Sequence, residues 1–499
     1  MKIEIFDTTL RDGEQGAGVE FSADDKIRVI HALDELGVSY IEAGMMTDDP
    51  AKHAFFHSLS GLELKNAKLA VFGQTCRAGE KAADNPALRA IAECGVPAAV
   101  LYGKAWNYQV TDVLKTTGGE NLRMIYDSIS FVKASGKEVI FDAEHFFDGY
   151  ADNPVYAMCV VDTAFLAGAS RVVLCDTNGG MLPDVIGMVC AAVTKKHKNI
   201  GIHCHNDLGM ATANTLAAVQ NGARQVEVTI NGLGERAGNT ALEEVVMAIK
   251  CHSNLDFEVG IDSKQIITTS KLVSNLMRMP VQANKAIVGR NAFAHSSGIH
   301  QDGVLKSRET YEIIDPEDVG VDQSSIVLTA RSGRAALKHH LAEIGYSPEG
   351  EELDEIYQRF LELADKKKMI TTRDLEVLIG TAASRRRMSI QLTGLQIVCG
   401  KSTVPTATVQ ISFDGDTFTE TACGNGPVDA AITAVKNITK RRVHIEEFLI
   451  QAITRGSDDL GKVHMSISHK GKMYHGFGAN TDIVTASVES FIDAISKIA

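Results

Sequence analysis

Two histidines separated by one residue stand near the middle of this 499-residue chain. His203 and His205 end a short apolar run, with Cys204 between them. Because side chains alternate between the two faces of a strand, both imidazoles should point to one side and Cys204 to the other. The spacing suits two ligands on one metal ion, although a His-x-His pair also occurs as an ordinary polar strand end.

A divalent ion at this place needs a carboxylate as well, and Asp12 follows the first apolar run of the chain. Asn239, after the eighth strand predicted below, could add an amide oxygen. Such mixed oxygen and imidazole ligands suit Mn²⁺, Mg²⁺ or Zn²⁺. Asp7 lies inside the apolar run, and we expect it to support the site or the core rather than to bind the ion.

The chemistry open to such a site is the activation of a 2-oxo acid, whose carboxylate and ketone oxygens can chelate the ion. Arg11, beside Asp12, could stabilise the negative charge that develops on the ketone oxygen, or it could form a salt bridge to a nearby carboxylate. Glu144, next to His145, ends another apolar run and could act as an acid or base. A structural hydrogen bond is the alternative for Glu144.

The elements that must position these side chains form a regular series in the first 255 residues. Strand patterns are expected at residues 3–9, 40–44, 68–74, 97–104, 137–144, 171–177, 199–205 and 225–231. Helical patterns lie between or after them, among others at 23–37, 120–136, 154–168, 183–196, 211–222 and 239–251. Eight repeats of strand and helix predict a parallel (β/α)8 TIM barrel, whose active site lies at the C-terminal ends of the strands, rather than an open doubly wound sheet.

Two further regions follow the predicted barrel of residues 1–255. Residues 256–385 have mainly helical patterns and an unusual polar, glycine-bearing stretch at 291–303, so we expect helical linker subdomains there. Residues 386–499 contain an internal repeat, in which 407–435 resembles 462–491. Each copy predicts a hairpin, a third short strand, a glycine turn and an amphipathic helix, which together make a pseudo-symmetric α+β domain.

A glycine-rich loop at residues 424–427 opens the helix of the first copy. It could cradle a phosphate, but it lacks the Lys-Ser/Thr pair of a nucleotide-binding loop. Pro427 as the first helical residue after a glycine turn explains the loop structurally, and we favour that interpretation.

Composition excludes several classes of partner. The net charge is −13 and there is no basic stripe, so nucleic acid is not expected to bind. No apolar run reaches membrane-spanning length, and no signal peptide pattern opens the chain. The nine cysteines are scattered without a Cys-x-x-Cys pair, which indicates free thiols, mostly in the core, in a cytoplasmic protein.

Five segments resemble the family of 2-isopropylmalate, homocitrate and citramalate synthases: residues 6–15, 203–209, 232–239, 294–303 and 424–430. The resemblance covers the whole chain, and the last three segments carry its specificity, because lyases and carboxyltransferases of the wider superfamily share the first two. It implies a Claisen-type condensation of acetyl-CoA with a metal-bound 2-oxo acid, followed by hydrolysis of the thioester.

The resemblance also implies a role for individual residues. The implied metal ligands are Asp12, His203, His205 and Asn239. Arg11 resembles the residue that stabilises the ketone oxygen, Thr177 a contact to the substrate carboxylate, and Glu144 a catalytic carboxylate. His300 and Tyr311 resemble residues that the linker of the partner subunit of a homodimer delivers to acetyl-CoA, although His300 could also be a core or capping histidine.

Within the family, residues 102–106, 141–150 and 175–179 look most like a citramalate synthase branch, which uses pyruvate in isoleucine biosynthesis. Trp106 is expected to shorten the substrate pocket there. The nearest alternative is 2-isopropylmalate synthase, with a roomier pocket for 2-oxoisovalerate. The C-terminal repeat resembles the regulatory domain of the family, which implies a branched-chain amino-acid effector, expected to be isoleucine, near the dimer interface.

Three readings of other classes are weaker. A hydroxyacyl-CoA lyase is expected to carry a cysteine in the loop 232–239, which has none. A biotin-dependent carboxyltransferase would carry a Met-Lys-Met sequence, which does not occur. An amino-acid-sensing protein without turnover is disfavoured because every implied metal and arginine position is filled.

Overall fold

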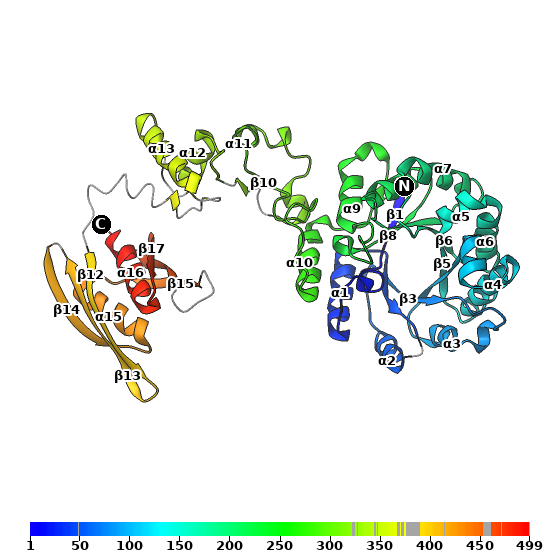
Figure 1. The fold of residues 1–499 in the computed structure, drawn as a ribbon, viewed down its shortest axis with the longest axis horizontal. Helices are drawn as coiled ribbons and strands as arrows, with labels where there is room; N and C mark the ends of the chain where they lie inside the picture. The colour runs from blue at the N-terminus through cyan, green and yellow to red at the C-terminus, as the bar shows by residue number, and fades with distance from the viewer. Residues whose placement is uncertain are drawn as a thin grey trace. The chain divides into compact units, whose positions relative to one another are not determined.

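The computed structural model describes residues 1–47, 49–321, 325–326, 328–343, 346, 348–366, 370, 374–375, 390–413, 415–452, 461–470 and 472–498. The chain divides into two compact units, Met1–His339 and His340–Ala499, each of which has its own order of helices and strands (Figure 1). The residues that the structure describes contain no helix that is both apolar enough and long enough to span a lipid bilayer.

The first unit contains a closed barrel of eight parallel strands, as the sequence predicts. The strands are β1 (Lys2–Asp7), β2 (Tyr40–Met45), β3 (Lys68–Gln74), β4 (Ala98–Lys104), β5 (Glu138–Glu144), β6 (Arg171–Asp176), β7 (Ile200–Cys204) and β8 (Gln225–Val228). Each strand pairs with the next, and β8 pairs with β1, which closes the barrel. A short strand, β9 (Glu258–Val259), also pairs with β1 and was not predicted.

Helices surround this barrel (Figure 1). They are α1 (Ala23–Leu36), α2 (Pro50–Ser58), α3 (Pro86–Glu93), α4 (Gly118–Ala134), α5 (Phe146–Asp152), α6 (Pro154–Leu166), α7 (Pro183–Thr194), α8 (Ala211–Gln220) and α9 (Leu242–Cys251). Their starts follow local sequence signals, such as the capping box between Ser22 and Asp25 of α1. The same helix ends at Gly37, whose φ of 95° is the left-handed geometry that glycine tolerates.

The start of α9 differs from the predicted helix 239–251. Residues 239–241 are not helical, because Asn239 forms a bridge with His205 and Ala241 forms one with Thr229. The backbone N–H of Thr240 also donates to the carbonyl of Cys204 at 3.1 Å. This extended segment ties the loop after β8 to the end of β7.

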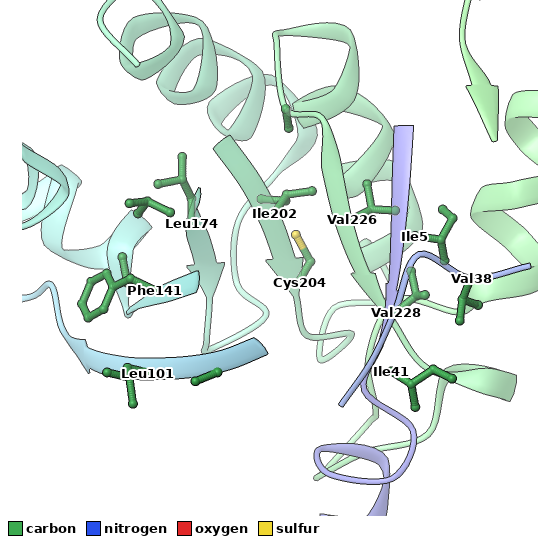
Figure 2. Close-up of a cluster of buried hydrophobic side chains, with 14 of the residues drawn as sticks. Ile5, Val38, Ile41, Leu101, Phe141, Leu174, Ile202, Cys204, Val226 and Val228 are labelled. Atoms are coloured by element: carbon green, nitrogen blue, oxygen red, sulfur yellow. The ribbon is translucent and has the colours of Figure 1, made fainter. Parts of the chain in front are cut away.

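Two clusters of apolar side chains pack against the barrel strands. One cluster lies between the barrel and its helices and includes Ile202, Cys204 and Val226, as Figure 2 shows. A second, smaller cluster includes Phe6, Val100 and other strand residues. The parity predicted for β7 is therefore confirmed, because Cys204 belongs to the outer hydrophobic layer and its two neighbouring histidines do not.

After the barrel, the described residues are mainly helical, as predicted. The helices are α10 (Ile266–Met277), α11 (Gly298–Lys306), α12 (Arg334–Glu343) and α13 (Glu351–Lys366). A small parallel sheet of β10 (Ala294–His295) and β11 (Ser325–Ile326) was not predicted. The boundary predicted near residue 385 lies outside the described residues.

The second unit contains the predicted pseudo-repeat. One half has β12 (Ile390–Gly400), β13 (Thr403–Phe413), β14 (Asp416–Cys423) and α15 (Pro427–Thr439), and the other has β15 (His444–Ala452), β16 (Gly461–His469), β17 (Lys472–Asn480) and α16 (Ile483–Ser496). Pro427 begins α15, as predicted from the glycine-rich loop. The third strand of each half precedes its hairpin and is nine or eleven residues long, so the short strand predicted after the hairpin was wrong.

The backbones of α16 and β17 approach each other closely. A Cβ atom added at Gly478 would lie 1.9 Å from the carbonyl oxygen of Ala486, and one at Gly476 would lie 1.9 Å from that of Ser490. Only glycine therefore fits at these two strand positions.

All nine cysteines are free, as predicted. Only some belong to the core, because Cys76, Cys175, Cys190 and Cys204 are buried whereas three others are exposed.

Candidate functional site

The carboxylate and the two imidazoles predicted from the sequence meet at the C-terminal end of the barrel. Asp12 lies shortly after β1, His203 lies in β7, and His205 follows it. Asp12 Oδ2 is 3.7 Å from Nε2 of His203 and 3.7 Å from Nε2 of His205. All three residues are buried, and they offer one ligand atom each within 4.8 Å of one another. This separation suits three ligands of one ion.

Asn239 lies beside Asp12. Its Nδ2 donates to Asp12 Oδ1 at 2.8 Å and to the carbonyl of Leu233 at 2.9 Å. Its Oδ1 is buried without a hydrogen-bond partner, and a buried polar atom of this kind calls for a ligand or an ordered water. One carboxylate, two imidazoles and one amide oxygen fit a divalent transition ion.

Two residues beside the histidines were missed by the sequence reasoning. Glu227 Oε2 lies 2.8 Å from Nδ1 of His203, and Arg236 Nη2 lies 2.7 Å from Nδ1 of His205. An acceptor such as Glu227 fixes the orientation of a ligand imidazole. Because a guanidinium and a metal-bound imidazole both present N–H groups, Arg236 would have to leave His205 when its Nε2 binds an ion. The only sign of Glu227 in the sequence is its place on the inward-facing side of β8. The only sign of Arg236 is its place in the motif of residues 232–239.

Arg11 is buried among acids and over an aromatic ring. Its Nε donates to Glu42 at 2.6 Å, its Nη1 donates to Asp12 at 2.8 Å, and its guanidinium carbon is 3.8 Å from the ring centre of Phe72. Burial alone would raise the pKa of Asp12, but the charge of Arg11 and the two nearby histidines hold that pKa well below its usual range. Asp12 is therefore a carboxylate at neutral pH, as a metal ligand must be.

The protonation of other buried groups also suits the site. Burial lowers the pKa of His203, which favours the neutral imidazole that binds metals. Burial and neighbouring carboxyl groups raise the pKa values of Asp142 and Glu227 well above normal. Burial likewise raises the pKa of Asp7 to about 7. The barrel mouth therefore carries less negative charge than its acids suggest.

A cavity of about 250 Å³ opens directly onto this cluster. The predicted residues Arg11, Glu144 and Thr177 all line it, together with Met45, Phe72, Tyr102, Asp142 and Cys175. Phe72 and Tyr102 stack with their ring centres 5.2 Å apart. Trp106 does not line this cavity, so the expectation that it shortens the pocket was wrong. Its Nε1 donates to Asp152 instead, because the chain leaves the strand before Trp106.

The side chains of Glu144 and Thr177 both have a close partner. Glu144 Oε2 lies 2.5 Å from Nζ of Lys104, at the ends of neighbouring strands β5 and β4. Thr177 Oγ1 accepts from the backbone N–H of His145 at 2.8 Å, which leaves the hydroxyl hydrogen available to a ligand. His145 has a φ of 58°, so the backbone turns sharply just after Glu144.

His300 and Tyr311 lie together but away from this cavity. Their rings stack with centres 4.4 Å apart, both residues are exposed, and neither lines the cavity of their own chain. Delivery of the two side chains by a partner subunit therefore stays a prediction.

A second cavity of about 680 Å³ adjoins the first. Asn239 and Arg236 line it, together with Lys285 and other residues of the loop after β8 and the segment after α10.

Comparisons with known proteins agree with this architecture. Residues 2–273 match the HMGL-like family model, residues 287–368 the homocitrate synthase post-HMGL domain-like model, and residues 369–499 the LeuA allosteric (dimerisation) domain. The last match indicates a homodimer with a regulatory domain.

Several curated relatives match this chain over nearly their full length. A protein of Parabacteroides distasonis named 2-isopropylmalate synthase is 48% identical and is covered over 99% of both chains. One of Olsenella uli with the same name is 43% identical, over 100% of this chain and 98% of that one. A solved HMG-CoA lyase of Bacillus subtilis is 20% identical, with a TM-score of 0.49, over 61% of this chain and 98% of that one. By its domain models and its full-length relatives, the chain belongs to the 2-isopropylmalate synthase and homocitrate synthase family of HMGL-like enzymes.

Proposed function

We propose that the protein is a 2-isopropylmalate synthase, which condenses acetyl-CoA with 2-oxoisovalerate and water to give 2-isopropylmalate and free CoA. The observation that carries the proposal is the convergence of Asp12, His203 and His205 on one point, with Arg11 beside them. The names of the full-length relatives favour this acceptor over the pyruvate expected from the sequence.

In this proposal, the side chains of Asp12, His203, His205 and Asn239 hold a divalent ion. When bound, such an ion supplies Lewis acidity that polarises the ketone of the acceptor. Arg11 donates a hydrogen bond to the ketone oxygen, where negative charge develops as the carbon–carbon bond forms. The ion pairs of Arg11 with Glu42 and Asp12 fix its guanidinium before the substrate arrives.

Thr177 and Glu144 act on the remaining parts of the substrates. The Thr177 hydroxyl donates to the carboxylate of the 2-oxo acid. Glu144, paired with Lys104, holds a carboxylate near the acetyl methyl group, which must lose a proton before it can attack the ketone. The 680 Å³ cavity beside Asn239 offers room for the long chain of the thioester.

A citramalate synthase is the second candidate, and the cavity walls favour it. Met45 and the stacked rings of Phe72 and Tyr102 are bulky side chains that line the 250 Å³ cavity, and Phe72 lies against Arg11. 2-Oxoisovalerate has two more carbon atoms than pyruvate. Burying them in an apolar pocket is worth about 1.6 kcal/mol, which corresponds to a roughly 15-fold difference in kcat/KM between the two acceptors.

The test is the rate of CoA release by the purified, metal-loaded protein with 2-oxoisovalerate and with pyruvate. A higher kcat/KM for 2-oxoisovalerate supports the proposal, and a preference for pyruvate would establish the second candidate. Tyr102→Ala should shift the preference toward the larger acceptor, whereas Tyr126→Ala, at an exposed position of α4, should leave it unchanged.

We also propose that the domains are residues 1–255, 256–385 and 386–499, and that the last binds an amino-acid effector. The expected effector depends on the activity: it is leucine for a 2-isopropylmalate synthase and isoleucine for a citramalate synthase. Inhibition of CoA release by one amino acid and not the other distinguishes them.

A further inference from the structure

The stacked pair of His300 and Tyr311 is built from two separate pieces of chain. His300 lies in α11, and Tyr311 follows a short 3-10 helix, η7 (Arg308–Thr310). The ring planes are inclined by 28°, and Tyr311 is 42% exposed. The stack thus joins an exposed histidine and an exposed tyrosine from two segments of the chain.

Gly303 provides the space for the tyrosine ring. It lies one turn after His300, on the same face of α11. A Cβ atom at Gly303 would lie 2.3 Å from Cε2 and 2.7 Å from Cδ2 of Tyr311. The backbone does not require glycine here, because Gly303 is helical and is not among the residues with positive φ. The close approach of the ring is therefore the reason for glycine within the helix.

Glu312 fixes the opposite side of the same segment. Its side chain is only 5% exposed, and Oε1 lies 2.7 Å from Nε2 of His295. Oε2 lies 3.3 Å from Nε of Arg308. With the Glu312 side chain anchored inside, the neighbouring Tyr311 side chain is directed outward.

The anchor of Glu312 is connected to the helix that carries His300. Nε2 of Gln301 in α11 donates to the carbonyl oxygen of His295 at 2.8 Å. His295 thus contacts both the segment of Tyr311, through Glu312, and the helix of His300, through Gln301. The two rings are held by one continuous set of contacts.

We propose that Gly303 and the His295–Glu312 pair are positioning residues that present His300 and Tyr311 to the reaction as one rigid unit. The inference rests on the proposed function and on the prediction from the sequence that His300 and Tyr311 act on acetyl-CoA. Gly303 acts through the tyrosine ring, whereas Glu312 acts through the backbone of the same segment. Neither needs to touch a substrate.

The first test is a double-mutant cycle of Gly303→Ala and Tyr311→Ala in the full-length dimer. Gly303→Ala should lower kcat by at least 10-fold with little change in the KM of the 2-oxo acid, and it should have no further effect when Tyr311 is already Ala. A purely structural role would lower activity equally in both backgrounds. Lys306→Ala, at a 73% exposed position of the same helix, is the matched control and should keep the wild-type kcat.

Gly303→Ala should keep or raise the melting temperature, since alanine favours a helix more than glycine does. If that variant fails to fold, Glu312 supplies the second test. Glu312→Gln keeps an acceptor for His295 and should retain most of the activity, whereas Glu312→Ala should lose at least 10-fold in kcat.

The outcomes separate this inference from the function on which it rests. A wild-type protein that releases no CoA with either acceptor would overturn both. An active wild type in which the effects of Gly303→Ala and Tyr311→Ala multiply, or in which Glu312→Ala keeps its kcat, would overturn the inference alone.

Discussion

Replacing Glu227 with leucine should weaken the binding of a divalent ion without removing any ligand atom. Glu227 is 1% exposed, and its Oε2 lies 2.8 Å from Nδ1 of His203. When Nε2 of His203 binds an ion, the ring proton is on Nδ1 and Glu227 is its acceptor. In Glu227→Leu that buried N–H has no acceptor, and water cannot readily replace it.

The magnitude follows from the loss of this one hydrogen bond. A buried donor left unsatisfied costs about 1–3 kcal/mol, and removal of an outer partner of a ligand histidine typically costs about 10–100-fold in metal affinity. Since tenfold corresponds to about 1.4 kcal/mol, the two ranges agree. We therefore expect the Kd for Mn²⁺ to rise by roughly 10–100-fold.

The assay is a titration of the metal-free protein with Mn²⁺, in which free Mn²⁺ is measured by electron paramagnetic resonance. Gln225→Leu is the matched control, because Gln225 is buried on the same strand but is paired with Gly201 rather than His203. Glu227→Gln keeps a carbonyl acceptor and should lie between the wild type and Glu227→Leu. A folded Glu227→Leu protein with wild-type affinity, or an equal loss in the Gln225→Leu control, would refute the reasoning.

Three other perturbations test separate parts of the structure. Asn239→Ala should raise the Kd for Mn²⁺ in the same titration, because it removes the unpaired Oδ1 and the hydrogen bond to Asp12. Asp34→Ala should lower the melting temperature at pH 7. Although burial alone would raise the pKa of Asp34, three backbone N–H groups of residues 65–67 lower it, so its contribution is present above pH ~4 and is lost as the pH falls further. The difference in melting temperature from the wild type should therefore shrink below pH ~4. Gly478→Ala should destabilise the C-terminal unit and reduce amino-acid inhibition, since its Cβ would meet the carbonyl of Ala486, while the melting of the barrel stays unchanged when followed by calorimetry.

The barrel and the ligand cluster were predictable because they depend on patterns within short segments of sequence, such as the alternation of side chains between the two faces of a strand. Each strand segment shows its own pattern, and the parity of β7 alone puts His203 and His205 on one face. Asp12 follows from the rule that active sites occupy the C-terminal ends of barrel strands. None of these predictions requires knowing which residues are paired between neighbouring strands.

The contacts that were missed depend on register and on loop paths. Glu227 meets His203 because these two residues are paired between β8 and β7, and a sequence does not give that pairing. Trp106 was misplaced because the chain turns after β4, so its side chain lies near Asp152 rather than in the pocket. The third strand of each C-terminal half was misplaced because the sequence repeat begins at the hairpin and leaves out β12 and β15.

Cys204 lies between His203 and His205 in the sequence, so its packing on the outer face of β7 affects where the two imidazoles lie. The Cys204 side chain packs between β7 and the surrounding helices. A bulkier residue at this position would displace β7 and change the distance between the two imidazole rings. We therefore expect substitutions on the face of α8 that packs against β7 to change ion affinity. The buried apolar packing around the barrel would then tune the ion site as much as the ligands themselves do.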